Sequence, residues 1–355
     1  MSRSATAYIN LDHLCHNYRL LRQRAGKARL IAVVKANAYG HGLDLVTPAL
    51  QAEGCNHFAV TDASEGATLR EILGSNAEIV LLSGIFDRSD AGLAVEHRLT
   101  PVIAESWQLQ ILAKEGFSRD VWMKADTGMG RLDTRDLSSL MTESRNMGIH
   151  PIGVMSHLAC ADTPDHPLNR IQVERMERLS IMLPPNTALS LLNSAGISIM
   201  PEHCFDVVRP GIALYGAEPT PARPLGLKPV MQLTCGVIQV RSIPAGTTIS
   251  YGATYTAKTD KRIAIVSLGY ADGLHRLLSN RGHAIYKGMA LPVLGRICMD
   301  YCILDAGDAP LTHGDEVTFW GEAPLATHVA DQAETIAYEL FTGVAPRVTR
   351  LPVRS

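Results

Sequence analysis

The chain has 355 residues, a formal net charge of −2 and 46% apolar residues, which is typical of a globular protein with a sizeable core. Basic residues form no block, and no apolar run approaches the roughly 20 residues of a membrane span, so we expect neither a nucleic-acid nor a membrane partner. The N-terminal segment lacks the apolar stretch of a secretory signal, and seven cysteines are too few for a disulfide scaffold. These features predict a cytoplasmic protein with reduced thiols.

The first part of the chain alternates short apolar strands with helical patterns. A first helix is predicted that carries Leu11, Leu14, Tyr18 and Leu21 on one face and ends before Gly26. Asp62 and Glu65 have the spacing of a capping box that opens a later helix. Further helices are predicted at 105–115 and 170–183. Eight strands are predicted at 30–35, 57–61, 78–83, 100–104, 120–125, 152–157, 188–192 and 205–208. This alternation favours a (β/α)8 barrel over an open sheet.

The pattern changes after a segment that is rich in proline, between Pro219 and Pro229. Beyond it, strand-like runs are broken by Gly and Pro and are followed by one helical pattern at 329–341. The strands are predicted at 233–242, 262–268, 283–286, 291–294, 298–304 and 316–320. We therefore expect a barrel domain at 1–225 and a mostly-β domain at 226–355.

Lys35 ends the first of the buried strands, where a lysine needs an explanation. Its side chain could extend to the surface and keep its ammonium in water. Alternatively, a desolvated amine of lowered pKa is suited to form a Schiff base with a carbonyl group. The position of Lys35 alone does not decide between the two.

Other polar side chains also stand where strands of the predicted barrel end, which is where barrel enzymes carry their active sites. Any one of them could merely cap a turn. They are Lys124, Asp126, His157, Asn193, Ser194 and Arg209. After strands seven and eight, the usual phosphate site of such barrels, Ser194 offers a hydroxyl and Gly211 permits a close backbone approach. A phosphate site combined with a Schiff-base lysine implies pyridoxal 5′-phosphate. Cys298 and Cys302 are a single pair without companions, so no metal site is expected.

Six segments spread over the whole chain resemble those of bacterial alanine racemases, the barrel-type (fold type III) pyridoxal-phosphate enzymes. In the barrel they are AVVKANAYGHG at 32–42, KADTGMGR at 124–131 and VRPGIALYG at 208–216. In the second domain they are SYGATY at 250–255, GYADG at 269–273 and GRICMD at 295–300. The resemblance implies an isomerase that interconverts L- and D-alanine as a homodimer with shared active sites, and so supplies D-alanine for peptidoglycan.

The resemblance also implies roles for individual residues. Lys35 would hold the cofactor and act as acid and base on one face of the substrate, with Tyr251 of the second subunit on the other face. Further cofactor contacts would come from Tyr39, Arg131, His157, Ser194, Arg209, Gly211 and Ile212. Arg131 and Met299 would contact the substrate, and Lys124 is the position that many relatives carbamylate. The entrance would be lined by Tyr270, Arg276, Arg296 and Asp300.

One position departs from the family pattern. Aligning the segment around Tyr338 with relatives places Pro346 where they carry a tyrosine at the phosphate and the inner gate. This alignment predicts an incomplete pair of gate tyrosines, a wider entrance and acceptance of serine or larger amino acids.

Three other functions remain open from the sequence. A serine or broad-specificity racemase would use the same scaffold. A barrel-type decarboxylase would need an acidic residue at the cofactor's pyridine nitrogen, where the resemblance places Arg209. A non-enzymatic cofactor carrier would need neither Tyr251 nor a second domain.

Overall fold

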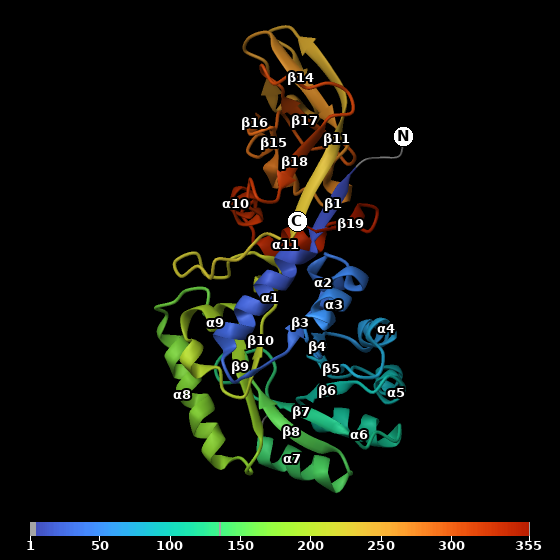
Figure 1. Cartoon of the computed structure of the whole chain (residues 1–355), viewed down its shortest axis with the longest axis vertical. Helices are drawn as coiled ribbons and strands as arrows, with labels where there is room; N and C mark the ends of the chain where they lie inside the picture. The colour runs from blue at the N-terminus through green and yellow to red at the C-terminus, as the bar shows by residue number, and fades with distance from the viewer. Residues whose placement is uncertain (1–4, 135, 355) are drawn as a thin grey trace.

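The computed structural model describes residues 5–134 and 136–354. Figure 1 shows an α/β barrel joined to an elongated β domain that projects from one end of it. Residues 1–4, on which the prediction of a missing signal partly rests, lie outside the described residues. Among the described residues, no helix is both long and apolar enough to cross a bilayer.

The barrel forms as predicted, and its first strand closes it. The strands run parallel in the order β2-β10-β9-β8-β7-β6-β5-β4-β3. Ile31 separates β2 from β3, so one stretch of chain pairs with β10 on one side and β4 on the other. The strands are β2 (Arg29–Leu30), β3 (Ala32–Val33), β4 (His57–Val60), β5 (Glu78–Leu81), β6 (Thr100–Ile103), β7 (Asp120–Lys124), β8 (His150–Met155), β9 (Ala188–Asn193) and β10 (Val207–Arg209).

Helices surround these strands and cover their outer faces, while the strand side chains fill the interior. The α-helices of this part are α1 (Leu11–Ala25), α2 (Lys35–Tyr39), α3 (Leu43–Ala52), α4 (Ala63–Leu73), α5 (Arg88–Glu96), α6 (Ser106–Lys114), α7 (Leu137–Asn146), α8 (Pro167–Met182) and α9 (Ser194–Ile199). Short 3-10 turns follow at η1 (Pro201–His203) and η2 (Ile212–Tyr215). The element α2 is not a regular helix, and its conformation shapes the site described below.

The second part is built on an eight-stranded sheet that also recruits the start of the chain. Strand β1 (Thr6–Asn10), which the sequence did not reveal, pairs antiparallel with β11 (Met231–Ile243) and parallel with β19 (Thr349–Val353). The expected barrel domain 1–225 therefore includes five residues that pair in the other sheet. The remaining strands of this part are β12 (Thr248–Ile249), β13 (Tyr255–Thr256), β14 (Lys261–Val266), β15 (His283–Tyr286), β16 (Met289–Pro292), β17 (Cys302–Asp305) and β18 (Glu316–Trp320). Its 3-10 turns are η3 (Tyr251–Ala253), η4 (Tyr270–Asp272) and η5 (Arg276–Leu278).

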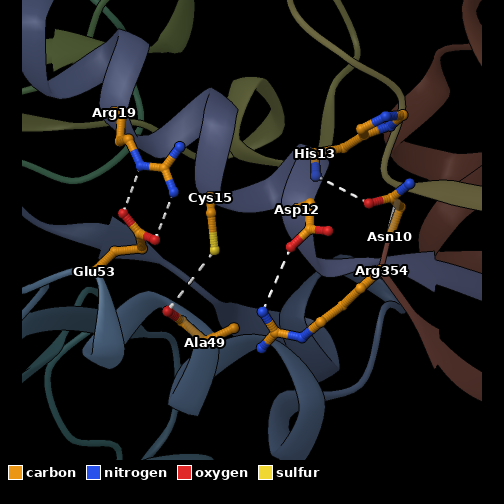
Figure 2. A network of polar contacts seen from close by, with 8 residues as sticks. All are labelled: Asn10, Asp12, His13, Cys15, Arg19, Ala49, Glu53 and Arg354. Carbon is orange, nitrogen blue, oxygen red and sulfur yellow. Dashed lines mark hydrogen bonds and ion pairs between the residues drawn. The ribbon is translucent and has the colours of Figure 1, made fainter.

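Helix α1 connects the two sheets, and polar contacts hold its first turn and its middle (Figure 2). Asn10 caps the helix by accepting a hydrogen bond from the His13 N–H at 3.0 Å. Arg354 lies 3.4 Å from the Asp12 carboxylate, and Arg19 forms a bidentate pair with Glu53 of the loop after α3. Such exposed ion pairs contribute little energy, so they orient α1 more than they stabilise it.

Two predictions for the second part are wrong in detail. The helix predicted at 329–341 is two helices, α10 (Ala326–Gln332) and α11 (Ala337–Gly343). Glu334 adopts φ +54°, a left-handed conformation that ends α10 without the glycine that normally signals such an ending. The strand predicted at 298–304 begins only at Cys302, because residues 298–300 form a loop against η4.

Candidate active site

A cavity of about 410 Å³ lies at the carboxyl ends of the barrel strands. Its walls bring together all the barrel residues predicted to bind cofactor, and Lys124 with them. They are Lys35, Tyr39, Lys124, Arg131, His157, Ser194, Arg209, Gly211 and Ile212. Asn193, also singled out by its strand-end position, lines the cavity too. Tyr338 and Thr342 of α11 line it as well, and sequence analysis did not assign them to the site.

Lys35 enters the cavity from the turn after β3. The next four residues, Ala36 to Tyr39, all have φ between 51° and 54°, so α2 is a left-handed turn without glycine. Such backbone costs about 1–2 kcal/mol for each L-residue. Burial and the nearby Arg131 lower the pKa of Lys35, while Glu65 raises it. Lys35 is thus the desolvated amine that the second interpretation of the sequence required.

Tyr39, at the end of the same turn, lies against Gly211. A Cβ at Gly211 would stand 2.4 Å from the Tyr39 hydroxyl, so only glycine lets the two segments approach this closely. Ser194 Oγ accepts hydrogen bonds from the N–H groups of Gly211 at 2.9 Å and Ala213 at 3.2 Å. The Tyr39 hydroxyl, the Ser194 hydroxyl and the tight backbone turn at Gly211 therefore lie on one wall of the cavity.

Gly211→Ala is expected to displace Tyr39 and to raise the Kd for pyridoxal phosphate about tenfold or more. Fluorescence titration of the apoenzyme measures this. Gly92→Ala is the matched control, because a Cβ on Gly92 would meet no atom within 4 Å. An unchanged Kd for Gly211→Ala would mean that the close contact has no part in binding.

Arg209 lies at the base of the cavity and is only 4% exposed. Its guanidinium donates to Ser190 Oγ, to the Ser156 carbonyl at 2.5 Å and to His157 Nδ1 at 3.1 Å. Because a guanidinium has no acceptor, His157 Nδ1 must accept and is unprotonated. Burial and the cations Arg209, Lys124 and Arg131 hold the pKa of His157 well below its usual range. His157 is therefore a neutral ring with a fixed tautomer.

Lys124 and Arg131 bring further positive charge from β7 and the loop after it. Asp126 organises that loop by accepting backbone N–H groups of residues 128–131. Burial raises the pKa of Asp126, but these donors more than compensate and lower it. Burial, Arg209 and Arg131 lower the pKa of Lys124 to about 7. Near neutral pH, a substantial share of this amine is therefore uncharged.

The lining of the cavity fits pyridoxal phosphate. Lys35 supplies an accessible amine of lowered pKa for the aldehyde, and the wall around Tyr39, Ser194 and Gly211 supplies hydroxyls for a phosphate. Lysine and arginine side chains provide positive charge for a phosphate, a phenolate and a carboxylate together. Among the described residues, no group of three or more His, Cys, Asp or Glu side chains is placed to hold a metal ion.

The residues predicted from the second domain lie outside this cavity. Tyr251 is 71% exposed and Met299 is 52% exposed. Backbone and hydroxyl hydrogen bonds tie their loops together: Ser250 Oγ donates to the Arg296 carbonyl, and the Tyr270 N–H donates to the Cys298 carbonyl. The residues predicted to line the entrance, Tyr270, Arg276, Arg296 and Asp300, belong to the same region, where Asp300 pairs with Arg347. The second domain thus carries its predicted site residues on an exposed surface.

The predicted gap in the pair of gate tyrosines, at Pro346, stays a prediction. Pro346 is not among the residues that line the cavity, and Tyr338 of α11 is. The Tyr338 ring lies 5.9 Å from the Tyr39 ring, centroid to centroid. Gly40 makes this approach possible, because a Cβ there would overlap the Phe341 carbonyl. Tyr338 therefore supplies a tyrosine beside Tyr39 in the lining of the cavity, at a position that sequence analysis did not assign to the site.

Comparison with known proteins agrees with the fold and the cavity. The alanine racemase N-terminal domain matches residues 9–219, and the C-terminal domain matches residues 230–352. The catabolic alanine racemase of Agrobacterium fabrum is 40% identical over 96% of this chain and 90% of its own length. The biosynthetic alanine racemase of Pseudomonas aeruginosa superposes with a TM-score of 0.90 at 36% identity, over 99% of both chains. The alanine racemase of Bartonella henselae, solved with covalently bound pyridoxal phosphate, superposes with a TM-score of 0.92 at 32% identity, again over 99% of both chains. The chain belongs to the alanine racemase family and is a pyridoxal-phosphate-dependent isomerase of alanine.

Proposed function

We propose that Lys35 and the partner subunit's Tyr251 move protons on opposite faces of the alanine Cα. The observation that carries this proposal is the position of Lys35, a desolvated amine beside Arg131 in a cationic cavity. When bound, pyridoxal phosphate supplies the electron sink that makes the substrate Cα–H acidic enough to remove. Lys35 would hold the cofactor and then give and take the proton on its own face.

Each site would need a second chain, because Tyr251 and Met299 face outward from the subunit that carries them. Tyr301 and Tyr270 are also 49% and 42% exposed, and a surface that exposes this many large side chains favours burial against another protein. We propose a homodimer in which this surface closes the partner's cavity. Met299 would then lie beside the substrate carboxylate, with Tyr270, Arg276, Arg296 and Asp300 around the entrance.

The cationic side chains of the cavity would bind pyridoxal phosphate and favour racemisation over side reactions. Tyr39, Ser194 and the amides of Gly211 and Ile212 would hold the phosphate, and Arg131 the phenolate oxygen and substrate carboxylate. Arg209 would face the pyridine nitrogen, supported by His157. Because a guanidinium only donates hydrogen bonds and stays charged, it would keep that nitrogen unprotonated and weaken the electron sink. Return of the proton to the substrate Cα would then be favoured over side reactions such as transamination. Arg209 also argues against a decarboxylase, which would need an acidic residue at that nitrogen.

We expect Lys124 to be carbamylated, because carbamylation requires an uncharged amine and the pKa of Lys124 is lowered to about 7. The resulting anion could pair with Arg131 and brace it. Carbon NMR of enzyme incubated with ¹³C-bicarbonate should show a carbamate signal that Lys124→Ala removes and the exposed control Lys114→Ala retains. A spectrum without that signal would rule the modification out under those conditions.

Alanine is expected to be strongly preferred over serine and lysine, because the Tyr338 and Tyr39 rings lie 5.9 Å apart in the cavity lining and restrict the space for a larger side chain. Circular dichroism that follows the loss of optical activity from each L-amino acid gives kcat/KM for all three. Comparable values for alanine and serine would instead favour the broad-specificity alternative. Tyr338→Ala should reduce the difference in kcat/KM between alanine and the two larger substrates. Pro346→Ala, as matched control, should leave that difference unchanged.

The cellular setting is a further part of the proposal. All seven cysteines lie among the described residues and are free thiols, which supports a reducing compartment such as the cytoplasm. We propose that D-alanine for peptidoglycan is the product used by the cell. Rescue of a D-alanine auxotroph by this chain, and failure of the Lys35→Ala variant to rescue, would support that role.

A further inference from the structure

The left-handed turn that joins Lys35 to Tyr39 needs support from outside itself. All four residues from Ala36 to Tyr39 have positive φ, and none is glycine. Left-handed backbone is unfavourable for L-residues, and its exposed N–H groups need acceptors. Since Lys35 and Tyr39 stand at its two ends, the shape of this turn fixes the spacing between the amine and the hydroxyl in the cavity.

The support comes from Glu65, in the first turn of α4. In a complete capping box its carboxylate would return to the backbone of Asp62. Asp62 does cap the helix by accepting the Glu65 N–H at 2.9 Å, but the Glu65 carboxylate accepts the N–H of Asn37 at 2.7 Å. The Asn37 side chain in turn accepts the Leu43 N–H at 2.8 Å. The turn is therefore attached to α4 on one side and to α3 on the other.

Glu65 also acts on Lys35 through its charge. Arg131 from the loop after β7 and the neutral His157 after β8 are the other titratable groups that interact with Lys35. Burial and Arg131 lower the pKa of Lys35, whereas the Glu65 carboxylate raises it. Burial raises the pKa of Glu65 itself, and the N–H groups of Asn37, Ala36 and Thr61 oppose that rise.

We propose that Glu65 is a positioning residue for the racemase reaction: its half-buried carboxylate holds the left-handed turn and thereby sets the placement and charge of Lys35. The proposal rests on the role proposed for Lys35. Sequence analysis assigned Glu65 to helix capping, but its carboxylate supports the turn after the neighbouring strand β3. Glu65 itself need not touch the substrate.

Two variants separate the hydrogen bond from the charge. Glu65→Gln keeps an oxygen that can accept the Asn37 N–H but removes the negative charge, and Glu65→Ala removes both. Glu71→Gln is the matched control, since Glu71 is an exposed glutamate of the same helix. For each apoenzyme, we would measure the Kd for pyridoxal phosphate and the pH midpoint of Lys35 acylation, followed by peptide mass spectrometry. Neither readout requires turnover.

We expect both Glu65 variants to acylate Lys35 with a midpoint at lower pH than wild type. The Kd for pyridoxal phosphate should rise on the order of tenfold in Glu65→Ala and less in Glu65→Gln. If both Glu65 variants kept the wild-type pH midpoint of Lys35 acylation and the wild-type Kd for pyridoxal phosphate, the proposal would be overturned. This would hold even if the variants unfolded at a lower temperature than wild type. If Glu65→Ala does not fold, the midpoint of Glu65→Gln decides alone. A Lys35→Ala enzyme that still linked cofactor covalently would instead overturn the role of Lys35.

Discussion

Lys35→Ala is expected to abolish covalent cofactor binding and to lower kcat by at least about 10³-fold, because it removes both the attachment point and one of the two acid–base groups. Wild-type enzyme should show a visible absorbance band that borohydride abolishes, with the label on the Lys35 peptide. The variant should lack this label while keeping its fold by circular dichroism.

Lys114→Ala, an exposed lysine of α6, is the control and should match wild type in absorbance and rate. Added alkylamine should restore part of the activity of Lys35→Ala, since a free amine can replace the missing acid–base group. A variant that retained the borohydride-sensitive label would show that another amine holds the cofactor.

Tyr251→Phe is expected to slow proton exchange from L-alanine by about 10²–10⁴-fold, because it removes one hydroxyl acid–base group and keeps the ring. Exchange from D-alanine should fall much less, since Lys35 serves that face. Deuterium incorporation from heavy water, followed by mass spectrometry for each enantiomer, measures the two separately.

Tyr301→Phe is the matched control, because Tyr301 is a neighbouring exposed tyrosine without a proposed part in the chemistry. It should leave both exchange rates unchanged. Equal losses from both enantiomers in Tyr251→Phe would contradict a role on one face.

The barrel and its cavity could be predicted from the sequence because both follow from local patterns. Short apolar strands end in polar residues, and parallel strands bring all those ends to one rim. Lys35, His157 and Arg209, from three separate strand ends, therefore meet in the structure as predicted. Strand β1 escaped detection because its partners, β11 and β19, lie more than 200 residues away, so no neighbouring strand in the sequence points to it.

Other features depend on contacts that no local pattern reports. Tyr338 reaches the cavity because α11 packs its Phe341 carbonyl against Gly40, a contact between segments that lie about 300 residues apart in the chain. Glu65 has the spacing of a capping residue, yet its carboxylate accepts the Asn37 N–H from the turn after the neighbouring strand β3. The left-handed conformation of Ala36, Asn37 and Ala38 is stabilised by such neighbours, against the preference of the residues themselves.

Mixing subunits tests most directly whether Lys35 of one chain and Tyr251 of its partner form one active site. Lys35→Ala and Tyr251→Phe homodimers, each inactive in L-to-D conversion, would be combined in equal amounts, dissociated and reassociated. A shared site predicts that each mixed dimer regains one intact site, so activity should recover to about one quarter of wild type. If Lys35 and Tyr251 of the same chain worked together, every site would stay defective and the mixture would remain inactive.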